Sequence, residues 1–505
     1  MWTATGSYAE PLQSDEQPES WHAFTPDLHT ARLTANRMRE MNFDYRMNKL
    51  CPAATAPGFF SHQTDMLNSS GARAWDSNRF YRDFDFFAYK YALIASVGSA
   101  GLNSIVNTLP ARDAEEYAKF PAADLAFIKT WLGWTDTHRD LLRSQRTLPI
   151  APGHGKVDGS FAFHGENGVP CPADKPTCPG FLFLFNPNGK RLTPQSIVLG
   201  PELGIDCASM PSTSVHLLEV FPRNRTLATV TCGHVWAPQP MAGKTALVVR
   251  AEFGGQAAAP RLVGMEGTAA FDRVTGELAL DGVRGERGST ARASVLGVAG
   301  VGSVTVNGKR LPADAFTHDA SASSTELTLT FAGARFDQSQ EVVGSWSSSR
   351  SSFSGTFSVP AWVFAQLKQR NQTYPIDWTE DDLSASWLSP GRLLLFLEAA
   401  ASKDVSSALP SVGADSAIPG GGSDEPKSAT VTASVDGKPL PTLQSFNCRG
   451  LHRHDCFSGF YWDMTDVRPD VDHKLEVKIG QFSVPAGMDL GLFFDNVEAE
   501  LVEFQ

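Results

Sequence analysis

Short strand-like segments, each bounded by turn residues, fill most of the chain after Pro149 and strongly limit the folds that it can adopt. They are rich in β-branched and aromatic residues, and Gly, Pro or Asn separates them; examples are GFLFLFNPNG (180–189), ALVVRAEF (246–253), SVTVNG (303–308) and TELTLTF (325–331). Many short strands at this spacing are typical of antiparallel β-sandwiches. We therefore predict two or more antiparallel β-sandwich domains in this part of the chain. The expected divisions are a sandwich at 151–255, a β-rich domain at 256–345 and a further β-domain at 346–505.

The first 150 residues mix helix and strand patterns instead. The segment 88–98 (AYKYALIASVG) is apolar and ends in glycine, which favours a buried strand. The segment 121–145 predicts an amphipathic helix, with an apolar stripe made of Leu125, Ile128, Leu132, Leu141 and Leu142. Near residues 409–428, the run LPSVGADSAIPGGGSDEPKS predicts a linker or a long disordered loop.

Cysteine usage favours an oxidising compartment. Six of the seven cysteines form local pairs, which predict short disulfide-closed loops: Cys171 with Cys178, Cys207 with Cys232, and Cys448 with Cys456. N-glycosylation sequons at Asn68, Asn224 and Asn371 also favour the secretory compartment. We predict a secreted or lumenal protein. The N-terminal segment has no basic start and no apolar core, so it is not a signal peptide, and we expect the true start to lie upstream.

Charge and hydropathy exclude several partners. The net charge of −12 argues against nucleic acid or an anionic membrane as the main partner. A membrane span needs roughly 18 or more apolar residues. The best apolar run, RLLLFLEAAA at 392–401, is interrupted by Glu398, so we predict no membrane span.

Five motifs, taken in order, resemble a known enzyme family. They are AFTPDLHTAR (23–32), PGFFSHQTDM (57–66), YALIASVG (91–98), WLGWTDTHRDLLR (131–143) and GFLFLFNPN (180–188). The series resembles the C-terminal part of α-galactosidase and raffinose-synthase-type glycoside hydrolases, which are retaining (β/α)8-barrel enzymes. This resemblance implies the later part of a barrel in residues 1–150, with the sandwich at 151–255 packed on it. A complete barrel takes about 250 residues.

The same resemblance implies where the chemistry lies. TPD at 25–27 matches the family's acid/base motif, so Asp27 is the candidate general acid/base, and His62 matches a histidine beside the sugar subsite. The family's Lys-x-Asp nucleophile has no match upstream of Asp27. Retaining hydrolysis needs two carboxyl groups about 5 Å apart, so activity requires that missing partner. An alternative role for Asp27 is the N-cap of the following helix.

Other candidate substrate-binding residues each have an ordinary structural alternative. Trp75 is a candidate for stacking on a sugar or for a core contact. Asp83 and Asp85 are candidates for binding sugar hydroxyls or for plain surface charge. Arg112 and Asp113 lie where the mouth of a barrel is expected, and a local salt bridge is their alternative.

The C-terminal part also resembles a known module. YPIDWTEDDLSASWLSPGRLLLFLE (374–398) and FSGFYWDMTD (457–466) resemble the galactose-binding-like jelly rolls attached to β-galactosidases. For Trp378, Trp387, Tyr461 and Trp462 this implies sugar stacking, with core packing as the alternative. CRGLHRHDC (448–456) favours a disulfide-closed loop over a zinc site, because the cysteines are too far apart for a zinc knuckle.

These features together predict a glycoside hydrolase-like protein that acts on or binds terminal sugars. The proposed chemistry needs neither a metal nor an organic cofactor. The alternative is a secreted carbohydrate-binding or adhesion protein without catalytic activity.

Overall fold

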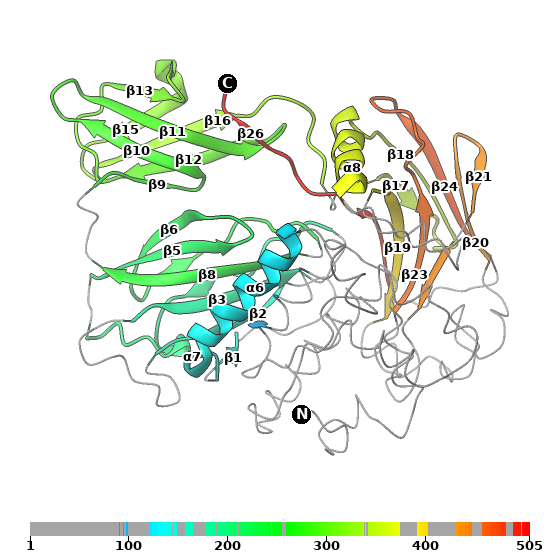
Figure 1. Ribbon diagram of the computed structural model, residues 1–505, viewed down its shortest axis with the longest axis horizontal. Helices are drawn as coiled ribbons and strands as arrows, with labels where there is room; N and C mark the ends of the chain where they lie inside the picture. Colours follow the sequence, from blue (N-terminus) through cyan, green and yellow to red (C-terminus); the bar gives the residue numbers. More distant parts are fainter. Residues whose placement is uncertain are drawn as a thin grey trace.

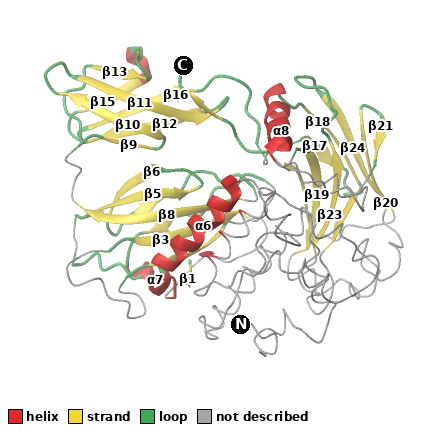
Figure 2. Cartoon of the chain, viewed as in Figure 1, coloured by secondary structure: helices red, strands yellow, loops and turns green. Residues whose placement is uncertain are grey.

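Antiparallel β-sheets dominate the described part of the chain (Figures 1 and 2). The computed structural model describes residues 90, 94, 97–98, 122–143, 145–148, 157–164, 178–186, 190–209, 212–243, 245–254, 259–337, 339, 342–373, 391–401, 430–441, 443–446, 457–480, 488–495 and 497–505. These residues form three β regions that follow one another along the chain, and the last strand returns to the middle region.

The first β region is a six-stranded antiparallel sheet covered by a helix. Its strand order is β1 (Arg146–Thr147), β2 (Asp158–Ala162), β3 (Gly180–Asn186), β8 (Thr245–Gly254), β5 (Ser214–Phe221) and β6 (Arg225–Thr231). Helices α6 (Ala122–Thr137) and α7 (Arg139–Arg143) lie on one face (Figure 1). The opposite face is covered by the two-stranded ribbon of β4 (Ile197–Val198) and β7 (Val235–Trp236), with the 3-10 turn η6 (Pro201–Leu203). This region is therefore one sheet between two covers rather than the predicted two-sheet sandwich.

Strand β3 explains how the sheet is buried on both faces. Its sequence GFLFLFN is apolar at every position but its ends, and all seven residues are buried. Phe181, Phe183 and Phe185 pack beneath α6, while Leu182 and Leu184 face the ribbon. A continuous apolar run is the pattern expected for a strand with both faces covered.

The N-terminal predictions have mixed outcomes. The helix predicted at 121–145 is confirmed as α6 and α7. Leu132, however, is 40% exposed and Trp131 occupies the buried stripe instead. The strand predicted at 88–98 is wrong, because the described residues of this segment, Lys90, Ile94, Val97 and Gly98, are helical. A short apolar run fits a buried helix as well as a strand.

Two polar contacts fix this helical segment against the sheet. The Gln145 amide donates to the Val97 carbonyl at 3.3 Å, and the Ser160 hydroxyl donates to the Gly98 carbonyl. A side chain at Gly98 would meet the Phe185 ring, so only glycine permits this close approach. No strand occurs among the residues described before Arg146, and the rest of the predicted barrel segment lies outside the described residues.

The middle β region is a sandwich of two sheets. One sheet has the order β15 (Phe316–Asp319), β16 (Ser324–Thr330), β12 (Thr290–Leu296) and β9 (Arg261–Val263). The other has the order β10 (Glu266–Asp272), β11 (Glu277–Glu286), β13 (Ser303–Val306) and β14 (Lys309–Arg310), with β26 (Leu501–Glu503) also paired to β11; the 3-10 turn η7 (Ala313–Ala315) precedes β15. Alternation along β16 buries Leu327 and Leu329 between the sheets and exposes Glu326 and Thr328.

The third β region is a second sandwich, with helix α8 (Ala361–Thr373) at one end (Figure 1). Its larger sheet has the order β17 (Val343–Trp346), β18 (Ser352–Phe357), β24 (His473–Gly480), β20 (Thr430–Val435) and β21 (Lys438–Leu440). The smaller has the order β22 (Leu443–Phe446), β23 (Phe457–Asp463), β19 (Leu394–Ala401) and β25 (Met488–Asp495).

The described sandwich assigns one of the four proposed stacking residues to the core. Trp462 is 0% exposed and packs between the two sheets, so it is not a sugar-stacking residue. Its strand partner is Leu395 on β19, which is also fully buried. Trp378, Trp387 and the side chain of Tyr461 lie outside the described residues.

The disulfide prediction is confirmed at Cys207–Cys232, which joins the turn after η6 to the end of β6 with a Cα–Cα distance of 5.4 Å. Cys178 is also disulfide-bonded. Its predicted partner Cys171, and the predicted pair Cys448 and Cys456, lie outside the described residues. Within the described part of the chain, no helix is long and apolar enough to cross a membrane.

Candidate functional site

The candidate catalytic and substrate-binding residues predicted in residues 1–150 do not fall in the described part of the chain. Outside it lie the candidate acid/base and every candidate substrate-binding residue, namely Asp27, His62, Trp75, Asp83, Asp85, Arg112 and Asp113. The described residues instead bring together two polar clusters that the sequence analysis did not identify. One lies at the junction of the β regions, and the other lies at the end of α6.

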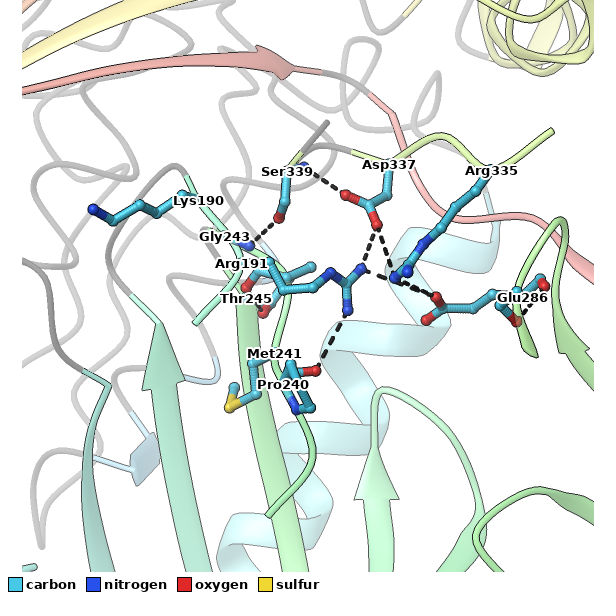
Figure 3. Close-up of polar contacts among 12 residues, drawn as sticks. Lys190, Arg191, Pro240, Met241, Gly243, Thr245, Glu286, Arg335, Asp337 and Ser339 are labelled. Carbon is cyan, nitrogen blue, oxygen red and sulfur yellow. Dashed lines mark hydrogen bonds and ion pairs between the residues drawn. The ribbon is translucent and has the colours of Figure 1, made fainter. Parts of the chain in front are cut away.

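The junction cluster consists of Arg191, Arg223, Glu286, Arg335 and Asp337. Figure 3 shows four of them, namely Arg191, Glu286, Arg335 and Asp337. Glu286 ends β11 and accepts hydrogen bonds from Arg223 and Arg335, each at 3.0 Å. Asp337 forms an ion pair with Arg191, and its second oxygen accepts from the Ser339 backbone at 2.7 Å.

Electrostatics hold this junction together. Burial raises the pKa of Glu286, but the charges of Arg223, Arg191 and Arg335 outweigh burial and leave that pKa below its ordinary value. The Asp337 side chain is only 7% exposed and shares both Arg191 and Arg335. Each carboxylate is thus already bonded to arginines. The ion pairs of the junction cluster therefore link the first and middle β regions, and the cluster is not a good candidate for a ligand site.

The second cluster, the aromatic–ionic cluster, consists of Trp134, His138, Phe181, Arg250 and Glu252. Three rings meet at the C-terminal end of α6: the centroid of Trp134 lies 4.7 Å from that of His138, and both lie 4.8 Å from that of Phe181. Arg250 and Glu252 form an ion pair at 3.1 Å on the neighbouring strand β8.

Regular periodicity brings these residues together. Trp134 and His138 are four residues apart, so they share a face of the helix. On β8, alternation places Arg250 and Glu252 on the same face as Val248, which packs beneath α6. Arg250 is also the direct neighbour of Phe181 on β3. The helix end and the strand therefore present aromatic and charged groups side by side.

Charge and exposure make this second cluster suitable for a polar ligand. Burial, and after it the positive charge of Arg250, lower the pKa of His138, so its imidazole is neutral at pH 7. A neutral imidazole has one donor and one acceptor nitrogen. The Arg250 and Glu252 side chains are 45% and 36% exposed, whereas Phe181 is buried beneath the cluster.

Further along the same sheet face, His216 of β5 is the direct neighbour of Glu252, and its Nδ1 lies 3.0 Å from the Thr229 hydroxyl. In the part of the chain that the structure describes, no group of three or more His, Cys, Asp or Glu residues is arranged to hold a metal ion. The side chains of the aromatic–ionic cluster offer groups for hydrogen bonding and for stacking.

The sequence did contain a signal for this cluster. WLGWTDTH, at 131–138, places two indoles and an imidazole at helical spacing, and RAE at 250–252 puts opposite charges two apart on a strand. Our sequence analysis used the first segment as an amphipathic helix and as one motif of the family resemblance, and neither use points to this cluster. Its pairing with β8 depends on the strand order β3-β8, which sequence patterns do not specify.

Comparison with known proteins assigns no family. No protein-family profile and no curated protein sequence matches the chain. Among solved structures, one similar chain is a β-porphyranase of glycoside hydrolase family 86 from the human gut bacterium Bacteroides plebeius. The match has 9% identity and covers 71% of this chain and 38% of that chain, so this protein spans about two fifths of it. The TM-score of 0.15 is too low to assign either a fold or an activity.

Proposed function

We propose that the protein binds carbohydrate and that the aromatic–ionic cluster is a sugar-contact site. The observation that carries this proposal is the exposed Arg250–Glu252 pair beside the partly exposed rings of Trp134 and His138. A pyranose ring has an apolar C–H face that packs on aromatic rings, and its hydroxyls both donate and accept hydrogen bonds. Arg250 supplies donors, Glu252 supplies acceptors, and neutral His138 supplies one of each.

Binding assays with site variants test this site. Arg250→Gln is expected to weaken binding of galactosides, such as lactose and methyl α-galactoside, by about tenfold or more, because a charge-assisted hydrogen bond contributes roughly 1.5–3 kcal/mol. Arg139→Gln is the matched control, since Arg139 is on α7, is exposed and pairs only locally with Asp136. Titration calorimetry or a glycan array measures the change. Equal weakening in both variants, or none in Arg250→Gln, would reject the site.

We further propose that the protein acts on terminal sugars through the candidate catalytic and substrate-binding residues identified in the sequence of residues 1–150. In this proposal residues 1–150 contain the later part of a barrel, Asp27 is the general acid/base, and His62, Trp75, Asp83, Asp85, Arg112 and Asp113 line the sugar site. The nucleophile comes from sequence upstream of Asp27. The alternative proposal is a carbohydrate-binding or adhesion protein, in which the sugar contacts serve attachment alone. In both proposals the Cys207–Cys232 disulfide is consistent with a secreted or lumenal location.

Turnover of an aryl glycoside separates the two proposals. In a chain that includes the upstream sequence, Asp27→Asn is expected to lower kcat on 4-nitrophenyl α-galactoside by about 10²- to 10⁴-fold, because the amide cannot transfer the proton. Asp15→Asn is the control, since no strand-like sequence precedes Asp15. Unchanged turnover in Asp27→Asn would remove Asp27 from the mechanism. Galactoside binding without turnover in the unaltered chain would favour the binding protein.

A further inference from the structure

The segment after the third β region returns to the middle one and completes its sheet. Figure 1 shows β26 running beside β11, although more than 200 residues separate them in sequence. Their pairing is antiparallel, with Arg284 opposite Glu503, Gly285 opposite Val502 and Glu286 opposite Leu501. Two further backbone hydrogen bonds flank these pairs: Arg287 N–H donates to Glu500 at 2.8 Å, and Phe504 N–H donates to Val283 at 3.1 Å.

The edge of β11 has room and hydrogen-bonding groups for this strand. Strand β13 pairs only with Glu277–Leu280, so the second half of β11 is left for another partner. The Asn307 side chain bridges the two pairings. Its amide accepts from Val283 N–H at 2.9 Å and donates to the carbonyls of Val283 at 3.0 Å and Phe504 at 3.1 Å. One side chain thus continues the hydrogen-bond ladder from β13 to β26.

Side-chain contacts also favour particular residues in the strand that pairs with the β11 edge. Val502 and Phe504 are two residues apart, and both pack against the core of the middle sandwich. The Phe504 ring meets the Phe331 ring edge-on, with centroids 6.0 Å apart. A side chain at Gly285 would collide with Phe331, so glycine lets that ring lie against β11. Glu500 forms an ion pair with Arg287.

We propose that the β11 edge from Val283 to Arg287 is a strand-acceptor site, and that it also accepts the 498–504 segment of a second copy of this chain. The ladder, the Asn307 bridge and the Phe331 contact recognise an extended segment with an acidic residue at Glu500 and apolar residues at Val502 and Phe504. The same contacts can form whether the segment comes from the same molecule or from a second copy. Added strands bind sheet edges in this way, with the backbone giving affinity and alternate side chains giving specificity.

The strand pairing itself is short and lies at the surface, which makes exchange feasible. Leu501, Val502 and Phe504 remain partly exposed, and Glu503 is exposed. The register contains three residue pairs. Loss of the segment would uncover unpaired backbone groups along β11, and an uncovered edge strand readily pairs with another chain. Strand exchange between two copies satisfies the same groups without a new interface.

Cross-linking between two differently tagged full-length variants tests the proposal. One carries Arg284→Cys and the other Glu503→Cys, because these exposed residues face each other across the pairing. After mixing and oxidation, we expect heterodimers whose yield rises with protein concentration. The control pair combines Arg284→Cys with Lys478→Cys, an exposed position on β24. Adding Phe504→Asp to the Glu503→Cys variant should reduce the cross-link by about tenfold, the effect of losing about 1.4 kcal/mol.

A peptide competition completes the experiment. Excess peptide VEAELVEFQ, residues 497–505, should suppress the heterodimer, whereas the same peptide with Asp in place of Phe504 should not. A heterodimer yield no higher than that of the control pair would overturn the proposal. So would a cross-link that the Phe504→Asp change leaves intact. Circular dichroism of each variant checks that the middle sandwich is folded, and a chain unfolded by Phe504→Asp alone would show that the segment is integral rather than exchangeable.

Discussion

Glu286→Gln is expected to lower the free energy of unfolding by about 3–5 kcal/mol, because it leaves three partly buried arginines with one remaining carboxylate. Asp281→Asn is the matched control, since Asp281 is exposed on the same strand and is expected to change stability by no more than about 0.5 kcal/mol. Chemical denaturation followed by tryptophan fluorescence measures both. Equal stability of the two variants would show that the junction cluster does not hold the β regions together.

The same substitution changes the pH dependence of stability. The folded pKa of Glu286 lies below its ordinary value, so its contribution to stability is fully present above the unfolded pKa of about 4.3. That contribution is lost as the pH falls through the lower folded pKa. The Glu286→Gln variant lacks this carboxylate and cannot lose its contribution. The difference in free energy of unfolding between the unaltered protein and the variant should therefore shrink below about pH 4. A constant difference down to pH 2 would contradict the assigned shift.

Phe183→Ala is expected to lower the free energy of unfolding by about 3–5 kcal/mol, the usual cost of removing a fully buried phenylalanine ring. The ring is 0% exposed and lies in the core that α6 forms with the six-stranded sheet, 6.3 Å from the Trp134 centroid. The cavity should loosen α6 first. Thermal unfolding, together with hydrogen exchange along residues 122–143, measures the effect.

Leu132→Ala is the control for this core variant, because Leu132 lies on the same helix but is 40% exposed. We expect it to change stability by no more than about 0.5 kcal/mol. A large effect of Leu132→Ala with a small effect of Phe183→Ala would mean that α6 packs through its other face. That outcome would return Leu132 to the apolar stripe inferred from the sequence.

The β-sandwich class and several strands could be predicted from the sequence because local patterns encode them. The segment at 325–331 alternates apolar and polar residues, and it forms β16 with Leu327 and Leu329 in the core. The segment at 180–186 is continuously apolar and forms the doubly covered strand β3. The Cys207–Cys232 bond agrees with one of the local cysteine pairs that the strand-rich context favoured.

Local patterns misled where two structures share one pattern. The segment 88–98 suits a buried strand and a buried helix equally, and its contacts with Gln145 and Ser160 belong to a helix. A tryptophan such as Trp462 can stack on a sugar or pack in a core, and the sequence does not distinguish these roles. Only its position between two sheets shows that it is a core residue. In each case the deciding partner lies far away in the chain.

The sequence alone determined that this chain forms antiparallel β-domains with a local disulfide, because side-chain periodicity and turn residues act over short distances. Only the tertiary structure decided which distant groups meet. It places Glu286 among three arginines, Arg250 beside Phe181, and the 498–504 segment on β11. Strand order and edge pairing depend on contacts between segments that can be more than 200 residues apart, and no local pattern encodes them.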